Sequence, residues 1–362
     1  MTPSADAIDA VSQRMERFTV ARLAEAAELG PDAESFARTA AGTAAGGKRL
    51  RARFCVSGWS AVAGARSARA TPGDDVISAA GALEFFHAAA LVHDDLIDNS
   101  DTRRGRPAAH RAIEAAHRTD GWIGDAAGFG RSAAILLGDL LVAWSDDLLE
   151  EGLAGAEHAA PARAEYARMR RDVTTGQYLD IAEEASAGTV ADHEHAERAL
   201  RVATFKSARY SVQQPLLIGA ALAGADAAQR DALARFGLPV GLAFQLRDDV
   251  LGVFGDSAVT GKPSGDDLRE GKRTLLIAYA RETLPTGARR ALDELLGDPA
   301  LDEEQIAFLQ NTIVESGALT RVEALIADWA GEADRALRGA ALDHASVSAL
   351  RELARAAVAR SS

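Results

Sequence analysis

The stretch of residues 82–98 constrains the fold more than any other part of the chain. It is alanine-rich and apolar, contains neither Gly nor Pro, and ends in a group of carboxylates. Apolar side chains recur at three- and four-residue spacing, as at Leu83, Phe86 and Ala90, which predicts a buried or half-buried helix. No run of β-branched residues alternates with period two, and aromatic residues make up only 5% of the chain. We therefore predict an all-α protein without a sheet.

Three carboxylates stand at the polar end of this predicted helix. Asp94 and Asp98 are four residues apart and share one face, with Asp95 beside them. Carboxylates gathered in this way repel one another unless a cation joins them, and oxygen-only ligands suit Mg²⁺. Fork-shaped donors for phosphate oxygens follow at Arg103, Arg104 and Arg106. The alternative is a solvent-exposed helix end that carries a run of charges. An exposed helix end would not need so apolar a stretch before it.

A second acidic cluster ends another apolar stretch. Asp248 and Asp249 follow Gln245 by three and four positions, so the three side chains share a face. Each acidic cluster precedes a loop that carries Lys or Arg. Together, the two clusters are typical of the walls of one metal–diphosphate site.

Charge and cysteine content exclude several function classes. The formal net charge of −13 argues against nucleic acid or an anionic membrane surface as a partner. It does not exclude phosphate substrates, because local cations can reverse the field inside a cleft. Cys55 is the only cysteine, which fits a reducing cytoplasm. We see no signal peptide and no apolar run near the roughly 20 residues of a membrane span, so we expect no stable membrane insertion.

These motifs resemble those of the trans-isoprenyl diphosphate synthase family, the polyprenyl synthetases, and in particular those of bacterial geranylgeranyl diphosphate synthases. GGKRLRA stands at 46–52, the first aspartate-rich motif reads DDLID at 94–98, and the second reads FQLRDDVLG at 244–252. Further matches, in family order, are EFFH, RRG, LLGD, GQ, a Lys-Ser pair and GKPSGDDLREGKRT.

The resemblance covers the chain from about residue 40 to residue 275. It implies a single isoprenoid-synthase-like domain over residues 1–362, built as a large helical bundle with a central cavity. It also implies a homodimer in the cytoplasm.

The implied activity is that of an Mg²⁺-dependent prenyltransferase, which joins isopentenyl diphosphate head to tail to an allylic diphosphate. No protein nucleophile is needed, which agrees with the absence of a Ser-His-Asp or Cys-His pattern. About three Mg²⁺ ions are implied on the allylic diphosphate, held by Asp94, Asp98 and Asp248. The other residues implied around that diphosphate are Asp95, Arg103, Lys206, Ser207, Gln245, Lys262 and Lys272. Those implied to bind isopentenyl diphosphate are Lys48, Arg51, His87 and Arg104.

The second motif departs from the family pattern at one position. Gly252 stands where a third aspartate is usual, so one carboxylate is missing. We expect Asp248 to hold metal there, with Asp249 acting directly or through water. Asp256 is a weaker candidate for the missing ligand.

Small residues precede the first motif on the predicted helix. Ala90 and Ala89 lie four and five residues before Asp94, one turn or about 6 Å deeper, which leaves a product channel open. Phe86, eight positions back on the same face, is the candidate floor two turns or about 12 Å down. We therefore expect a C20 product, geranylgeranyl diphosphate.

Two alternatives stay open on the sequence. A terpene cyclase would share the helical fold and the first motif, but it binds no second diphosphate and needs neither GGKRLR nor His87. A non-catalytic regulatory subunit of a prenyl synthase would tend to lose acidic ligands, and Gly252 is the only such sign. Some single residues also have a structural interpretation. His87 could be a histidine of the core, and Lys206 could be a lysine that reaches solvent. Gln177 and Asp180 could bridge two helices.

Overall fold

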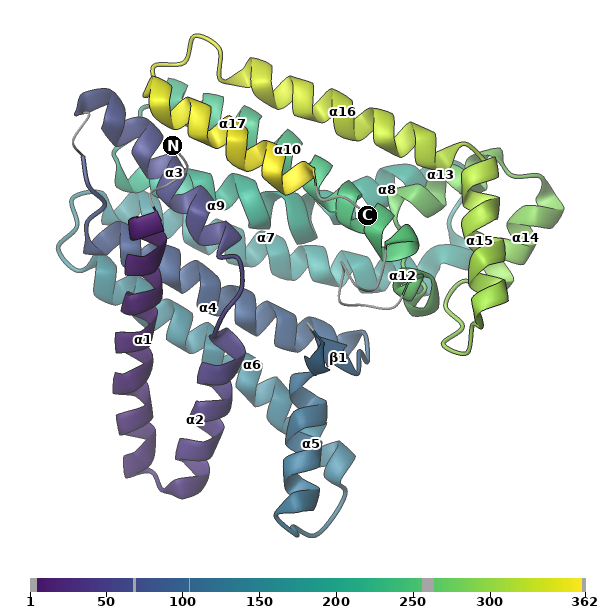
Figure 1. Ribbon diagram of the computed structural model, residues 1–362, viewed down its shortest axis with the longest axis horizontal. Coiled ribbons are helices and arrows are strands. Elements are labelled where there is room, and N and C mark those ends of the chain that lie inside the picture. The colour runs from purple at the N-terminus through teal and green to yellow at the C-terminus, as the bar shows by residue number, and fades with distance from the viewer. Residues whose placement is uncertain (1–4, 68–69, 104, 256–263, 360–362) are drawn as a thin grey trace. The chain divides into compact units, whose positions relative to one another are not determined.

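Most of the described chain is helical, as Figure 1 shows. The computed structural model describes residues 5–67, 70–103, 105–255 and 264–359. The prediction of an all-α protein is confirmed. Contacts within the chain divide it into two compact units, and each unit is described by itself. The expected single domain with a central cavity stays a prediction.

The two units are discontinuous in sequence. Unit 1 comprises Met1–Ala162, Ile218–Ala225 and Leu342–Ser346. Unit 2 comprises Arg163–Leu217, Asp226–Ala341 and Val347–Ser362.

Unit 1 is built around the apolar helix that ends in the first acidic cluster. Its elements are α1 (Ala5–Glu28), α2 (Pro31–Ala44), α3 (Leu50–Arg66), α4 (Asp74–Ile97), β1 (Thr102–Arg103), β2 (Arg106–Pro107), α5 (Ala109–Thr119) and α6 (Ala126–Leu153). Phe85 of α4 packs against Phe18 of α1 and Trp144 of α6, with ring centroids 5.6 and 5.9 Å away. These three buried rings fix α4 between its neighbours.

A short two-stranded ladder carries the arginines that follow the first acidic cluster. β1 and β2 pair antiparallel, with Arg103 opposite Arg106. Gly105 in the turn has a φ of 71°, a conformation that glycine adopts without a steric penalty. The sequence predicted no sheet, and this ladder corrects it. Strands of two residues are too short to show a period-two pattern.

Unit 2 holds the second acidic cluster at the end of its longest buried helix. Its elements are α7 (Ala159–Ser186), η1 (Ala187–Thr189), η2 (Asp192–Glu194), α8 (His195–Val202), η3 (Ala203–Gln213), α9 (Gln214–Leu222), α10 (Ala227–Phe254), α12 (Asp266–Glu270), α13 (Leu275–Thr283), α14 (Thr286–Leu295), α15 (Glu303–Glu315), α16 (Ala318–Ala336) and α17 (His344–Val358). α7, α9 and α17 have residues in both units.

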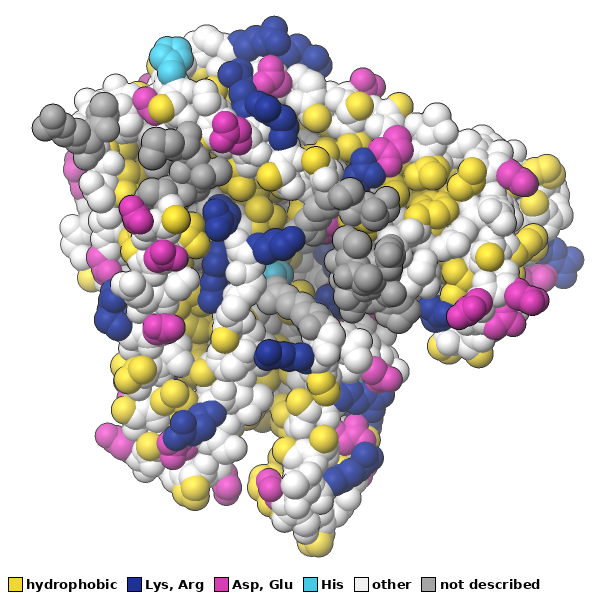
Figure 2. Space-filling view, in the orientation of Figure 1, with side chains coloured by type: hydrophobic (Ala, Val, Ile, Leu, Met, Phe, Trp, Pro, Cys, Tyr) yellow, Lys and Arg dark blue, Asp and Glu magenta, His cyan; other side chains and the backbone are white. Residues whose placement is uncertain are grey.

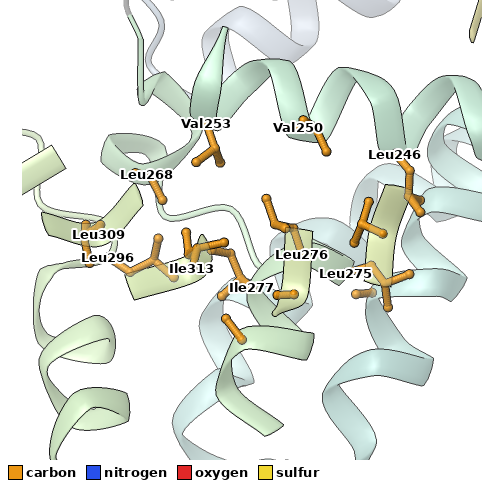
Figure 3. Packing of buried hydrophobic residues seen from close by; sticks show 14 of the residues in the cluster. Leu246, Val250, Val253, Leu268, Leu275, Leu276, Ile277, Leu296, Leu309 and Ile313 are labelled. Atoms are coloured by element: carbon orange, nitrogen blue, oxygen red, sulfur yellow. The ribbon is translucent and has the colours of Figure 1, made fainter. Parts of the chain in front are cut away.

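The core of unit 2 fixes the short helix α12 beside the end of α10. Val250 and Val253 of α10 lie in one cluster with Leu268 of α12 and Leu276 of α13, as Figure 3 shows. All four side chains are buried. Because Leu268 is the buried residue of α12, this contact determines where the polar residues next to it stand.

The segment that carries Lys206 is a π-helix. η3 has hydrogen bonds of the i→i+5 type, which are rare and are frequently found at functional sites. The sequence predicted one helix over 195–224 with a kink or break at Pro215. In the structure Pro215 is the second residue of α9. Because α9 continues directly from η3, the helix does not end at this proline, and the irregularity is the π-helix just before it.

Two helices are long and apolar enough to cross a membrane by length and composition. They are α4 and α6, and the most apolar part of α4 is largely buried in the protein whereas that of α6 is not. The expectation that no segment reaches this length is therefore wrong. For α4 the reason is its place in the core, since a core helix needs apolar residues on every side.

Candidate functional site

Asp94 and Asp98 stand one turn apart at the end of α4. Asp98 is the C-cap residue of this helix, and its backbone N–H donates to the carbonyl oxygen of Asp94 at 2.8 Å. Both side chains are half-buried. The predicted placement of these two carboxylates on one face is confirmed.

Asp95 is held inside unit 1 by an arginine. It is only 3% exposed, and Nε of Arg103 donates to its Oδ1 at 2.7 Å. Nη2 of the same guanidinium also bonds Asp95 and lies 3.5 Å from Oδ2 of Asp94. A cation that the chain itself supplies therefore stabilises the buried member of the aspartate pair.

The GGKRLR loop has a backbone that few sequences can adopt. Gly46, Gly47 and Arg49 have φ angles of 73°, 86° and 52°, and Arg49 is the N-cap of α3. A loop of this kind turns successive N–H groups to one side, at a helix N-terminus that already favours anions. Lys48 in the loop is exposed, and Arg51 in the first turn of α3 is buried.

His87 belongs to the same unit as the GGKRLR loop. It is half-buried on α4, seven residues or two turns before Asp94. The three predicted ligands of isopentenyl diphosphate that the structure describes, Lys48, Arg51 and His87, thus all belong to unit 1. Arg104, the fourth, lies outside the described residues.

In the second aspartate pair, as in the first, one carboxylate is buried and the other is half-buried. Asp249 is only 6% exposed, and Nε2 of Gln245 donates to its Oδ1 at 2.7 Å. Burial, and next the charge of Asp267, raises the pKa of Asp249 to about 8. Asp248 is half-buried. Gln245, predicted to bind substrate, bonds the buried carboxylate in this structure.

Asp267 of α12 fills the space beside Gly252. A Cβ atom on Gly252 would lie 1.9 Å from Oδ2 of Asp267, so this carboxylate stands where the side chain of a third motif aspartate would begin. Nζ of Lys272 is 3.5 Å from its Oδ1. Asp267 is not among the residues predicted from the sequence, although the paired aspartates in GDDLREGK offered a signal. Asp256 and Lys262 lie outside the described residues.

Lys206 lies where two neighbouring helices approach the backbone of η3. A Cβ on Gly176 of α7 would be 2.3 Å from the backbone nitrogen of Lys206, and one on Gly241 of α10 would be 2.3 Å from the carbonyl oxygen of Ala208. The Nζ of Lys206 pairs with the carboxylate of Asp180 on α7. The bridging role considered for Asp180 is confirmed. Ser207 is half-buried in the same π-helix.

The described residues contain no ready-made cage for a metal ion. Across 5–67, 70–103, 105–255 and 264–359, no group of three or more His, Cys, Asp or Glu side chains is arranged to hold one. The first motif belongs to unit 1 and the second to unit 2. Their predicted meeting around shared metal ions stays a prediction.

The chain is similar to known prenyl diphosphate synthases. Residues 34–313 match the family model described as polyprenyl synthetase. A short chain isoprenyl diphosphate synthase of Methanocaldococcus jannaschii is 31% identical over 233 residues, which are 64% of each chain. A geranylfarnesyl diphosphate synthase of Aeropyrum pernix is 33% identical over 284 residues, 77% of this chain and 79% of that one.

A solved structure resembles nearly the whole chain. It is the geranylgeranyl pyrophosphate synthase of Corynebacterium glutamicum, complexed with isoprenyl diphosphate and magnesium. It has a TM-score of 0.91 and 38% identity over 98% of both chains.

Gly176 offers a test of the close packing around Lys206. We expect Gly176→Ala to lower the free energy of unfolding by about 1–3 kcal/mol, because the new methyl group meets backbone that cannot move aside. Gly42→Ala is the control, since nothing lies within 4 Å of that Cβ position on α2. It should raise the same free energy by about 0.5–1 kcal/mol. Chemical denaturation of both variants measures this, and equal effects would contradict the close approach.

Proposed function

Because the chain belongs to the polyprenyl synthetase family, we propose that it condenses isopentenyl diphosphate with an allylic diphosphate. The products are a longer trans-prenyl diphosphate and inorganic diphosphate. The observation that carries the proposal is that the two aspartate pairs have the same arrangement. In each pair one carboxylate, Asp95 or Asp249, is buried and held by the chain, and the other, Asp94 or Asp248, is half-buried.

The side chains at both motifs fit Mg²⁺. They offer only carboxylate oxygens, the ligands that this ion prefers when it is bound together with substrate phosphates. We assign Asp94, Asp98 and Asp248 as ligands of about three ions. When bound, the ions neutralise the charge that develops on the leaving diphosphate. Magnesium and isoprenyl diphosphate in the similar structure from Corynebacterium glutamicum support the use of this ion.

The reaction uses positioning and charge, without a protein nucleophile. The allylic C–O bond breaks as diphosphate leaves, the double bond of isopentenyl diphosphate attacks the carbocation, and a proton then passes to the released diphosphate. Arg103, Lys206 and Lys272 stabilise the anionic leaving group in this proposal. Lys262 and Arg104, assigned to the two diphosphates, lie outside the described residues.

Two features of the chain favour a synthase over the alternatives. The positive-φ loop with Lys48, followed by Arg51 and faced by the helix of His87, offers a second diphosphate a place, which a terpene cyclase does not need. Asp267 beside Gly252 replaces the carboxylate whose loss suggested a regulatory subunit. We also place the chain in the cytoplasm, on the ground of its single cysteine.

The proposal predicts turnover that depends on both aspartate pairs and on a divalent metal. With isopentenyl diphosphate, an allylic primer and Mg²⁺, the purified chain should form longer diphosphates, and excess chelator should abolish this. Asp94→Asn and Asp248→Asn should each lower kcat by about 10²–10³-fold, because charge stabilisation of the leaving group is lost. Asp231→Asn, an exposed aspartate paired with Arg235, is the control and should not change kcat.

Other outcomes of that assay would contradict the proposal. Hydrocarbon products would indicate a cyclase. Turnover that appears only after a second protein is added would indicate a regulatory subunit.

We propose a C20 product because of the residues on α4 below the first motif. Phe86 and Ala89 are buried and Ala90 is half-buried, in agreement with a channel that narrows at Phe86. Phe86→Ala should extend the products beyond C20, because it removes the floor. Phe85→Leu is the control, since Phe85 packs against Phe18 and Trp144. Chromatography of the dephosphorylated products measures their length, and an unchanged distribution for Phe86→Ala would mean that another residue sets it.

We also propose a homodimer, in which α6 of one copy packs on a second copy. Leu136 is 60% exposed, and Phe129 and Ile135 of the same helix are also exposed. Figure 2 shows hydrophobic side chains at the surface around the end of α5, close to where α6 begins. An exposed apolar face of this kind marks an interaction site.

Leu136→Glu tests the dimer. It should shift the mass measured by light scattering from two chains toward one, because a charge would be buried in the interface without a partner. Val20→Glu is the control, as Val20 is 67% exposed on α1. A monomeric wild type, or a variant that stays dimeric, would contradict the interface on α6.

A further inference from the structure

Helix α3, which follows the GGKRLR loop, begins without a cap of its own. Its N-cap residue is Arg49, which makes no side-chain capping bond. The first backbone N–H groups of a helix have no partner within the helix, and side chains such as Ser, Thr or Asp usually accept from them. An arginine has no acceptor to offer, so the partner must come from elsewhere.

The missing acceptor is Glu84, on the neighbouring helix α4. The backbone N–H of Ala52, in the first turn of α3, donates to Oε1 of Glu84 at 2.9 Å. Glu84 is only 5% exposed. A buried carboxylate is costly without partners, and the positive end of a helix is one of the places that offset this cost.

The second oxygen of Glu84 faces Arg49. Oε2 lies 3.8 Å from Nη1 of Arg49, and the same nitrogen donates to the carbonyl oxygen of Ala44, the last residue of α2, at 3.1 Å. Arg49 has a φ of 52°, a region that costs a residue other than glycine about 1–3 kcal/mol. The two contacts of Nη1, with Glu84 and with Ala44, stabilise this conformation.

Glu84 thus links two sets of predicted ligands. Glu84 contacts Arg49 and Ala52, and each of these is preceded directly by a predicted ligand, Lys48 or Arg51. His87 follows Glu84 by three residues on the same face of α4. On the basis of the proposed function, we propose that Glu84 is a positioning residue: it holds the GGKRLR loop in the conformation that binds isopentenyl diphosphate. It does not contact the substrate itself. Its carboxylate charge sets the position of Arg49, and its oxygen caps α3.

Glu84→Gln separates this role from simple helix capping. The amide keeps an oxygen for the N–H of Ala52 but removes the charge that faces Arg49. In titration calorimetry the variant should bind isopentenyl diphosphate about tenfold more weakly. Its Kd for the allylic diphosphate should change by less than about twofold, since the metal motif is untouched. Glu84→Ala, which loses both contacts, should weaken isopentenyl diphosphate binding further.

The matched control is another capping carboxylate, at the start of a helix that carries no predicted ligand. Asp302 accepts from the backbone N–H of Gln305 at 2.8 Å at the start of α15. Asp302→Ala should lower the Tm and leave both Kd values unchanged. If Glu84→Gln binds isopentenyl diphosphate as wild type does, or weakens both substrates equally, Glu84 is only a structural cap and the proposal is wrong.

The proposed function and the role of Glu84 fail in different ways. A wild type that binds isopentenyl diphosphate without turnover contradicts the function, while the titration still decides the role of Glu84. A wild type that does not bind isopentenyl diphosphate contradicts both.

Discussion

A carboxylate leaves water for a protein interior only when a cation or hydrogen-bond donors meet it there. Asp95 meets this condition through Arg103, and Glu84 meets it through the first turn of α3 together with Arg49. Each of these two acids joins segments that carry predicted ligands. Asp249 accepts a hydrogen bond from Gln245 on the same helix, but burial and the charge of Asp267 still raise its pKa to about 8. The buried acids therefore organise the site.

The half-buried aspartates have a different place in this arrangement. Asp94 and Asp248 each stand next to a buried partner that the chain itself holds, Asp95 through Arg103 and Asp249 through Gln245. Metal ions suit such positions, because the neighbouring carboxylate is fixed and the backbone around it is rigid. Asp267 adds to the second cluster from α12, and the core contact of Leu268 holds that helix in place (Figure 3).

Glycines make the close approaches that this chemistry requires. At Gly176 and Gly241 two helices reach the backbone of the π-helix that carries Lys206, and at Gly252 the absent side chain leaves space for Asp267. A methyl group at any of the three positions would overlap its neighbour. Gly252 is thus part of a packing arrangement, in which a carboxylate from another helix occupies the space beside it.

The helical fold and the arrangement of the first aspartate motif could be predicted from the sequence, because both depend on periodicity within one element. Helical spacing placed Asp94 with Asp98, and composition excluded an extended sheet. The ladder around Gly105, the π-helix over Lys206 and the position of Asp267 could not be predicted. The ladder pairs strands of two residues, which are too short to show a pattern. The π-helix and Asp267 lie at contacts between different helices, such as that of Gly176 with Lys206 and that of Gly252 with Asp267. The pairing of Arg103 with Asp95 was missed for a related reason: the same residue types suit a phosphate ligand and an internal ion pair.

The central claim is that Asp94, Asp98 and Asp248 share metal ions on one diphosphate. A crystal structure grown with Mg²⁺ and a non-reacting allylic diphosphate analogue tests it most directly. We expect ions that bridge the diphosphate to both motifs, with metal–oxygen distances of about 2.0–2.1 Å. Ions held by one motif alone, with the diphosphate bound elsewhere, would contradict the claim.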